Sequence, residues 1–243
     1  MSTEGATHMN NRQRWFIVAI FAVAMAWLES AVVFYLRTWC NRIDPYQAEP
    51  LPNIAGLGGV EIIREAATLI MLWLVGMLAG NTPRSRWGYS AVAFGVWDIF
   101  YYVFLRLICP WPKSLLDWDI LFLLPLPWWG PVLAPVLIAV LMILWGTLAS
   151  QGEPFLHPFR VEWRAWLLNF AGTAVALYVF MADALQAAKG GPTAIRQVLP
   201  PPHGFNWPLF TVALALMAAP VVHTARQLRA RAGAPEFRTA KST

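Results

Sequence analysis

Six long runs of apolar residues follow one another along the chain, with polar and proline-containing segments between them. The runs cover residues 15–36, 56–80, 87–108, 131–150, 164–183 and 207–225. About 20 predominantly apolar residues are enough for a helix to cross the hydrocarbon core of a bilayer. The pattern therefore predicts an all-α, polytopic transmembrane helical bundle of about six spans. We expect residues 1–243 to form a single integral membrane domain with no separate soluble domain.

The segment near residues 114–129 does not fit this pattern. Its centre is apolar, but it is framed by Asp119 on one side and by Pro125 on the other. So short a run cannot cross a bilayer as a helix, and non-helical backbone at membrane depth has to be buried in protein. We predict that this segment is interfacial or re-entrant and packs against the bundle.

The composition agrees with a membrane location. The chain is 58% hydrophobic and 13% charged, whereas soluble domains carry about 25% charged residues. The net charge of +5 does not indicate nucleic-acid binding, because the basic residues lie at the ends of apolar runs. We expect the lipid bilayer to be the main partner, other membrane subunits to be further candidates, and nucleic acid to play no part.

Six spans place both chain ends on the same side of a membrane. The last apolar run is followed by a basic tail that contains Arg226, Arg229, Arg231, Arg238 and Lys241. Lys and Arg concentrate in the cytoplasmic segments of membrane proteins. We therefore predict a multi-pass protein of the cell membrane with cytoplasmic N- and C-termini.

The second apolar run contains charged residues, which are costly inside a bilayer. Glu61, Arg64 and Glu65 lie in its first half, on one helical face. Lipid does not solvate such groups, so this face has to point into the bundle or into a water-filled space. Glu29 and Asp98 lie at a similar depth in the first and third runs.

These charges predict a polar pocket that opens toward the outer side. The candidate residues for binding or translocation are Glu29, Glu61, Arg64, Glu65, Asp98, Tyr102 and Arg106. An alternative is that they only hold helices together, for example through a pair between Arg64 and Glu29 or Asp98. Buried pairs of this kind need no further function.

Histidine is too scarce for the common haem and metal sites of helical bundles. The chain has 4 His, of which only His223 lies near the end of an apolar run. Haem is usually held by an axial His, and di-iron bundle sites add His to carboxylates. We therefore predict no cofactor, no haem b and no metal site, and we leave the catalytic residues unassigned.

The 2 cysteines lie at corresponding places in the chain. Cys40 follows the first run and Cys109 ends the third, both on the predicted outer side. An outer compartment can be oxidising. We therefore hypothesise a disulfide between Cys40 and Cys109.

Three functions are compatible with these features. The leading hypothesis is a transporter or channel-like protein that moves protons, a cation or a small polar solute through the carboxylate cluster. The second is a non-catalytic accessory subunit of a larger membrane complex. The third is a membrane-embedded enzyme that acts on a lipid at the outer leaflet, which would need a lipid-sized groove between the spans.

Overall fold

A computed structural model describes residues 9–45, 57–122, 126–152, 162–191 and 204–232. Within these ranges the long helices are α1 (Asn11–Trp39), α2 (Leu57–Ala79), α3 (Pro83–Ile108), α4 (Leu133–Gln151), α5 (Trp163–Ala187), α7 (Trp207–Met217) and α8 (Ala219–Ala232). A short 3-10 turn, η2 (Ala188–Gly190), follows α5. The described residues contain 6 helical segments that are long and apolar enough to cross a membrane, with α7 and α8 together forming the last. The predicted six-span helical bundle is therefore supported, and each predicted span overlaps one of these helical segments.

Local sequence signals explain where several helices begin. The Asn10 side chain accepts a hydrogen bond from the Gln13 backbone, and the Gln13 side chain accepts one from the Asn10 backbone, so α1 starts with a complete capping box. Thr82 caps α3 in the same way, with proline in the first turn. At the start of α7 the Asn206 side chain accepts from the Leu209 backbone at 3.2 Å.

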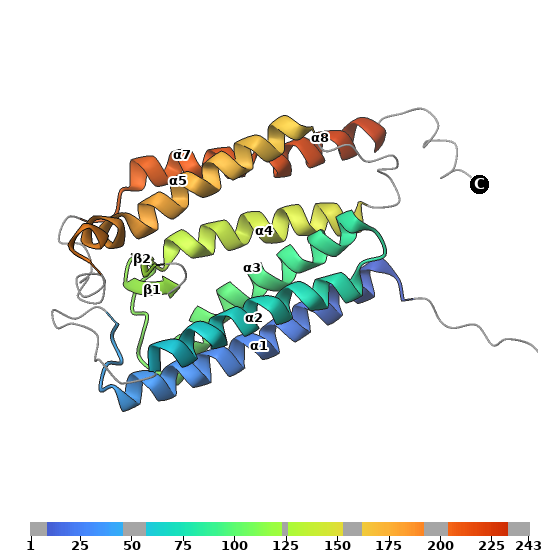
Figure 1. Cartoon of the computed structure of the whole chain (residues 1–243). Helices are drawn as coiled ribbons and strands as arrows, with labels where there is room; N and C mark the ends of the chain where they lie inside the picture. Colours follow the sequence, from blue (N-terminus) through green and yellow to red (C-terminus); the bar gives the residue numbers. More distant parts are fainter. Residues whose placement is uncertain (1–8, 46–56, 123–125, 153–161, 192–203, 233–243) are drawn as a thin grey trace, which may run out of the picture.

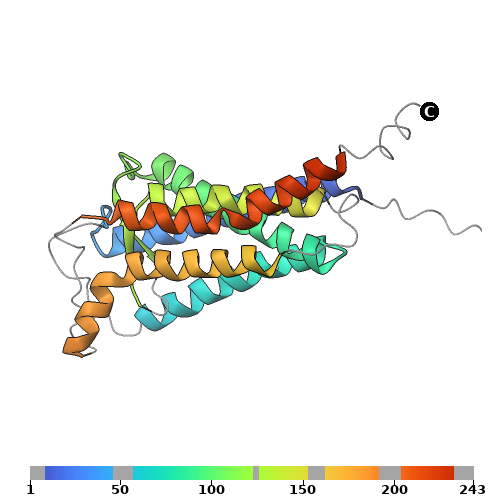
Figure 2. The same cartoon turned by 90° about the horizontal axis from the view of Figure 1, so that it is seen from above.

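The helices form two groups that meet at α4. Helix α3 packs against α1, α2 and α4, whereas α5 packs against α7 and α8, and α8 also contacts α4. Figures 1 and 2 show that α2 and α5 lie on the same side of the molecule, in front of α3 and α4. The start of α1 and the end of α8 lie at the same end of the bundle (Figure 1). Which side of a membrane this end faces stays a prediction.

Small residues bring α2, α3 and α4 into close contact. A Cβ atom on Gly76 of α2 would overlap the backbone of Ser90 on α3, and one on Gly146 of α4 would overlap the carbonyl oxygen of Gly88 on α3. Close backbone approach of this kind drives helix association where the surroundings are as apolar as the side chains. These contacts fix α3 as the central helix of its group.

One part of the all-α prediction needs correction. Residues 118–122 and 128–131 form the antiparallel strands β1 (Trp118–Phe122) and β2 (Trp128–Pro131). The pairing of the two strands satisfies backbone groups along their shared edge, which lowers the cost of packing a non-helical segment against the helices. The hairpin lies at one end of the bundle, and the start of α1 and the end of α8 lie at the other (Figure 1). We call the first of these the hairpin end.

Candidate functional site

A cavity of about 710 Å³ lies between the two groups of helices. Helices α2 and α5 provide two of its walls, α3 and α4 provide its floor, and β1, β2 and the C-terminal part of α1 line it toward the hairpin end. Helices α2 and α5 pack mainly on other helices rather than on each other. The cavity therefore lies between α2 and α5, which Figure 1 shows apart from each other.

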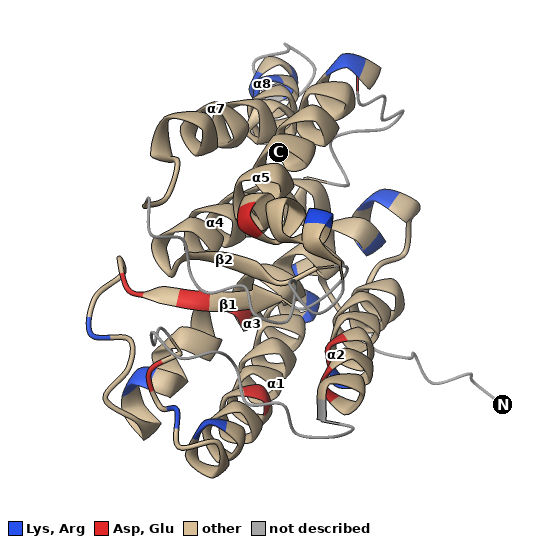
Figure 3. Cartoon of the chain, turned by 60° about the vertical axis from the view of Figure 1, so that its left-hand side comes forward, with Lys and Arg blue, Asp and Glu red and all other residues tan. Residues whose placement is uncertain are grey.

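The charged lining residues gather toward the hairpin end. Figure 3 brings this end forward and shows acidic positions on α1, α2 and β1. The described charged residues that line the cavity are Glu29, Arg37, Arg42, Glu61, Arg64, Glu65, Asp98 and Asp119. Five of these are carboxylates and three are guanidinium groups, so the charged end of the cavity has an excess of negative charge when all are ionised.

Arg64 joins α1 to α2 at this end. Its guanidinium forms an ion pair with Glu29 of α1 and a second one, 2.8 Å from Nε to Oε2, with Glu61 on its own helix. Thr68 donates a hydrogen bond of 3.1 Å to the other oxygen of Glu29. The predicted pair between Arg64 and Glu29 is therefore present. The N–H groups of Arg64 that form it and the pair with Glu61 are bonded to carboxylates of the protein itself.

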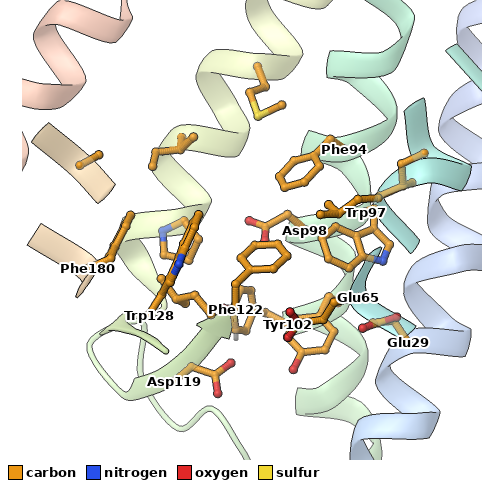
Figure 4. A pocket seen from close by; sticks show the side chains of 18 of the residues that line it. Glu29, Glu65, Phe94, Trp97, Asp98, Tyr102, Asp119, Phe122, Trp128 and Phe180 are labelled. Carbon is orange, nitrogen blue, oxygen red and sulfur yellow. The ribbon is translucent and has the colours of Figure 1, made fainter. Parts of the chain in front are cut away.

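Asp98 is different, because the structure gives it no such partner. Its residue is only 7% exposed, and Oδ2 is buried without a hydrogen-bond partner among the described residues. In Figure 4 the carboxyl group projects into the cavity at the level of Phe94 and Phe122. The Asp98 carboxyl group therefore lies at the cavity beside aromatic rings, while Oδ2 itself is enclosed by protein atoms without the hydrogen bond that buried polar atoms nearly always have.

Aromatic rings surround Asp98 and extend across the cavity. Trp97 lies 5.4 Å from Phe94 between ring centroids, Phe122 lies 5.1 Å from Trp128, and Trp128 stacks on Phe180 at 6.1 Å with an interplanar angle of 4°. Phe94 and Phe122 are themselves stacked at 6.4 Å. Figure 4 shows these five side chains, which come from α3, the hairpin and α5 and which we call the aromatic wall.

Two indole groups of the aromatic wall also have unused hydrogen-bonding capacity. Nε1 of Trp97 and Nε1 of Trp128 are buried and have no hydrogen-bond partner among the described residues. Burying such a donor without a partner costs free energy. The walls of the charged end therefore contain buried polar atoms without partners among the described residues, and Oδ2 of Asp119 is another of them.

The hairpin is held to α1 by a buried ion pair. Arg37 of α1 donates to Oδ1 of Asp119 on β1 at 2.8 Å, and its guanidinium lies 4.1 Å from the centre of the Trp111 ring. Asp119 is 1% exposed. Burial raises the pKa of Asp119 from its ordinary value of 3.8 to about 6, although the charge of Arg37 acts in the opposite direction.

The half of the cavity away from the hairpin is apolar. Its lining includes Met142, Trp145, Trp166 and Leu177, and the rings of Trp145 and Trp166 meet edge to face at 5.4 Å. No charged side chain lines this half in the described part of the chain.

Three polar side chains in the apolar half form hydrogen bonds within the protein, whereas Nε1 of Trp145 is buried without a partner among the described residues. Ser90 donates to a backbone carbonyl of α2 at 3.0 Å, Asn169 to one at the end of α7 at 3.2 Å, and Thr173 to one of its own helix at 2.9 Å. The cavity is thus amphiphilic along its length.

Comparison with known proteins gives no match: no protein-family model, no curated protein and no solved structure is significantly similar to this chain. Any assignment of function therefore rests on the geometry and chemistry of the cavity.

Most of the sequence-predicted site residues are brought together by the fold. The cavity is lined by Glu29, Glu61, Arg64, Glu65, Asp98 and Tyr102. Arg106 does not line it, because its side chain projects from the exposed face near the end of α3. Placement beside a cavity does not by itself assign a role to any of these residues.

The sequence analysis missed Arg37, Asp119 and the aromatic wall as parts of the site. Arg37 is not among the residues predicted for binding or translocation, and Asp119 lies in the segment that is predicted to be interfacial or re-entrant. The hairpin, whose strands the apolar pattern did not reveal, brings Asp119 and Phe122 to the cavity. The available signal was the clustering of aromatic residues around residues 118–129, which is typical of strands as well as of membrane interfaces.

The disulfide hypothesis is wrong for this structure. Cys40 and Cys109 are both free. Cys109 is buried beside Tyr102 and Trp111, and its thiol donates to the carbonyl oxygen of Leu105 at 3.1 Å. The thiol of Cys109 is therefore engaged within the packing around the end of α3.

The described residues also contain no group of three or more His, Cys, Asp or Glu side chains arranged to hold a metal ion.

Proposed function

We propose that this protein binds an amphiphilic lipid in the cavity, with the hydrocarbon chain between α2 and α5 and the polar end beside Asp98. The observation that carries this proposal is the division of one continuous cavity into a charged end and an apolar half. Ligand sites of this kind are mostly apolar, with a few convergent polar groups that fix the orientation of the ligand.

The dimensions support a lipid chain. Trp87, which lines the cavity near the start of α3, precedes Asp98 by eleven residues. At 1.5 Å per residue this corresponds to roughly 16 Å along the helix, compared with roughly 15 Å for half of a 30 Å hydrocarbon core. A chain about as long as one leaflet is thick can therefore lie along the apolar half.

The position of the cavity supports entry from the bilayer. Because α2 and α5 do not form a closely packed pair, a hydrocarbon chain can pass between them without leaving an apolar environment. An enzyme that acts on a lipid would also need a lipid-sized groove between the spans. Asp98 alone is a candidate reacting group here, so we propose lipid binding and leave any reaction unassigned.

The cavity gives less support to the translocation hypothesis. Protons, cations and polar solutes need polar groups or water along a path. The charged groups stop near Asp98, and Ser90, Asn169 and Thr173 of the apolar half donate to backbone carbonyls.

Photolabelling of the purified full-length protein tests the proposal. The probe is a long-chain alcohol with a diazirine at the far end of its chain, and mass spectrometry maps the labelled peptides. We expect labels on cavity-facing residues of α4 and α5, and we expect excess unlabelled alcohol to compete with them.

Two variants of α4 separate the cavity from the lipid-facing surface. Met142→Trp fills part of the apolar half and should remove the labels within the cavity. Leu144→Trp adds the same volume at a side chain that is 48% exposed and does not line the cavity, so labelling should persist. Labels confined to exposed helix faces, with the same pattern in both variants, would overturn the proposal.

A further inference from the structure

The charges around Asp98 restrict the kind of polar group that a lipid can bring there. Five carboxylates and three guanidinium groups line the described part of the cavity. Arg64 is engaged by Glu29 and Glu61, and Arg37 is engaged by Asp119. An anionic headgroup would thus meet an excess of negative charge, and these two arginines already have partners.

The aromatic wall offers a second, independent form of recognition. Ring faces carry partial negative charge and attract cations that lie within about 6 Å of the ring centre. The rings of Phe94, Trp97 and Phe122 lie 5.4 to 6.5 Å from one another and surround the position of Asp98 in the cavity. Buried aromatic rings beside an unpartnered carboxyl oxygen are complementary to a positive charge with N–H donors.

We propose that the cavity selects an amphiphile whose head is a positively charged amine, with its nitrogen against the Asp98 carboxyl group and the aromatic wall. This inference rests on the proposed function, because the hydrocarbon chain occupies the same apolar half. An ammonium group has three N–H donors, so it can satisfy Asp98 and still face the rings.

Other headgroups fit the same atoms less well. A phosphate would bring negative charge to the Asp98 carboxyl group. A hydroxyl group can donate to Asp98, but it carries no charge for the ring faces.

Competition against the photoreactive alcohol tests this headgroup preference. The competitors are a primary alkylamine, an alkanol and an alkyl phosphate with the same chain length, each added to the full-length protein at pH 7. We expect the amine to displace the probe at a concentration about tenfold lower than the alkanol, through its charge-assisted hydrogen bond and its contact with the rings. The phosphate should be the weakest competitor.

Two variants locate the source of the preference. Asp98→Asn should bring the amine to within about twofold of the alkanol, with both competitors measured against the probe labelling of that variant. Asp183→Asn removes a carboxylate that does not line the cavity, so it should leave the preference unchanged and thereby control for changes in surface charge. Phe122→Leu keeps an apolar side chain but removes a ring, and should reduce the preference partially.

The outcomes distinguish the two proposals. If the alcohol never labels the cavity, the proposed function is wrong. If the alcohol labels the cavity but amine and alkanol compete equally, only the headgroup inference is wrong. An amine preference that is retained in Asp98→Asn would also overturn the inference, because the selectivity would then originate elsewhere.

Discussion

Arg64 is the side chain whose removal tests most directly how α2 is held beside the cavity. Its guanidinium pairs with Glu29 of α1 and Glu61 of α2. Replacing Arg64 by Met keeps much of the length of the side chain but removes the positive charge. Glu29, whose side chain is 11% exposed, then keeps only the hydrogen bond from Thr68.

The expected loss of stability is substantial. Removing one partner of a buried ion pair costs about 3–5 kcal/mol, because the other charge is left buried and uncompensated. The Arg64 side chain is 22% exposed, so water and mobile headgroups can partly replace it. We therefore expect the free energy of unfolding of Arg64→Met to fall by about 3 kcal/mol, the lower end of that range.

Unfolding in mixed micelles, with SDS as the denaturant and helical circular dichroism as the signal, measures this change. Arg106→Met is the matched control, because Arg106 is exposed and lies toward the same end of the bundle. Its stability should stay within about 0.5 kcal/mol of the unmodified protein.

A double-mutant cycle provides the result that would refute the reasoning. If Glu29→Gln is combined with Arg64→Met, the uncompensated charge disappears and the loss should be smaller than the sum of the two single losses. We expect a coupling energy of about 2 kcal/mol between the two positions. Strictly additive losses would show that the pair does not join α1 to α2 energetically.

Three further predictions follow from the packing and the buried groups. Gly76→Leu should prevent α2 from reaching α3 and should destabilise the protein strongly in the same SDS titration, whereas Gly58→Leu, at a site with open space, should not. Because burial raises the pKa of Asp119 to about 6, the folded form binds more protons than the unfolded form between about pH 4 and pH 6. The contribution of Asp119 to the free energy of unfolding should therefore fall as the pH rises through that window and stay constant above it. Asp119→Asn should remove this dependence on pH. An unchanged dependence would assign the titration to another group. Without prior reduction, maleimide should label Cys40 and leave the buried Cys109 unlabelled until the protein is denatured, whereas protection of both thiols until a reductant is added would restore the disulfide hypothesis.

Hydrophobic patterning predicted the helices of this protein well. Six runs of suitable length were sufficient because a bilayer-spanning segment has to satisfy its own backbone, and a helix is the simplest way to do so. The hairpin was not predicted, because residues 118–122 and 128–131 are short and apolar, and their pairing with each other is a tertiary property. A run of that length is also compatible with a buried helix segment.

The candidate site could be predicted only in part. The charges of Glu61 and Arg64 stood out within an apolar run because their burial is costly, and this cost forces them toward the interior. The partner of Arg64 was left open between Glu29 and Asp98, since helical periodicity gives the face of a residue but not the neighbour of that face. Arg106, which the same reasoning included, turned outward near the end of α3.

By itself, the sequence determined that the chain forms long apolar helices and that Glu61, Arg64 and Glu65 cannot face lipid, because both follow from transfer free energies along one segment. Only the tertiary structure decided that Arg64 is occupied by Glu29 and Glu61 while one oxygen of Asp98 stays unpartnered. It also decided that five aromatic rings from α3, the hairpin and α5 meet around one cavity. Such contacts depend on how separate segments pack, and the separation of α2 from α5 is what leaves room for a ligand.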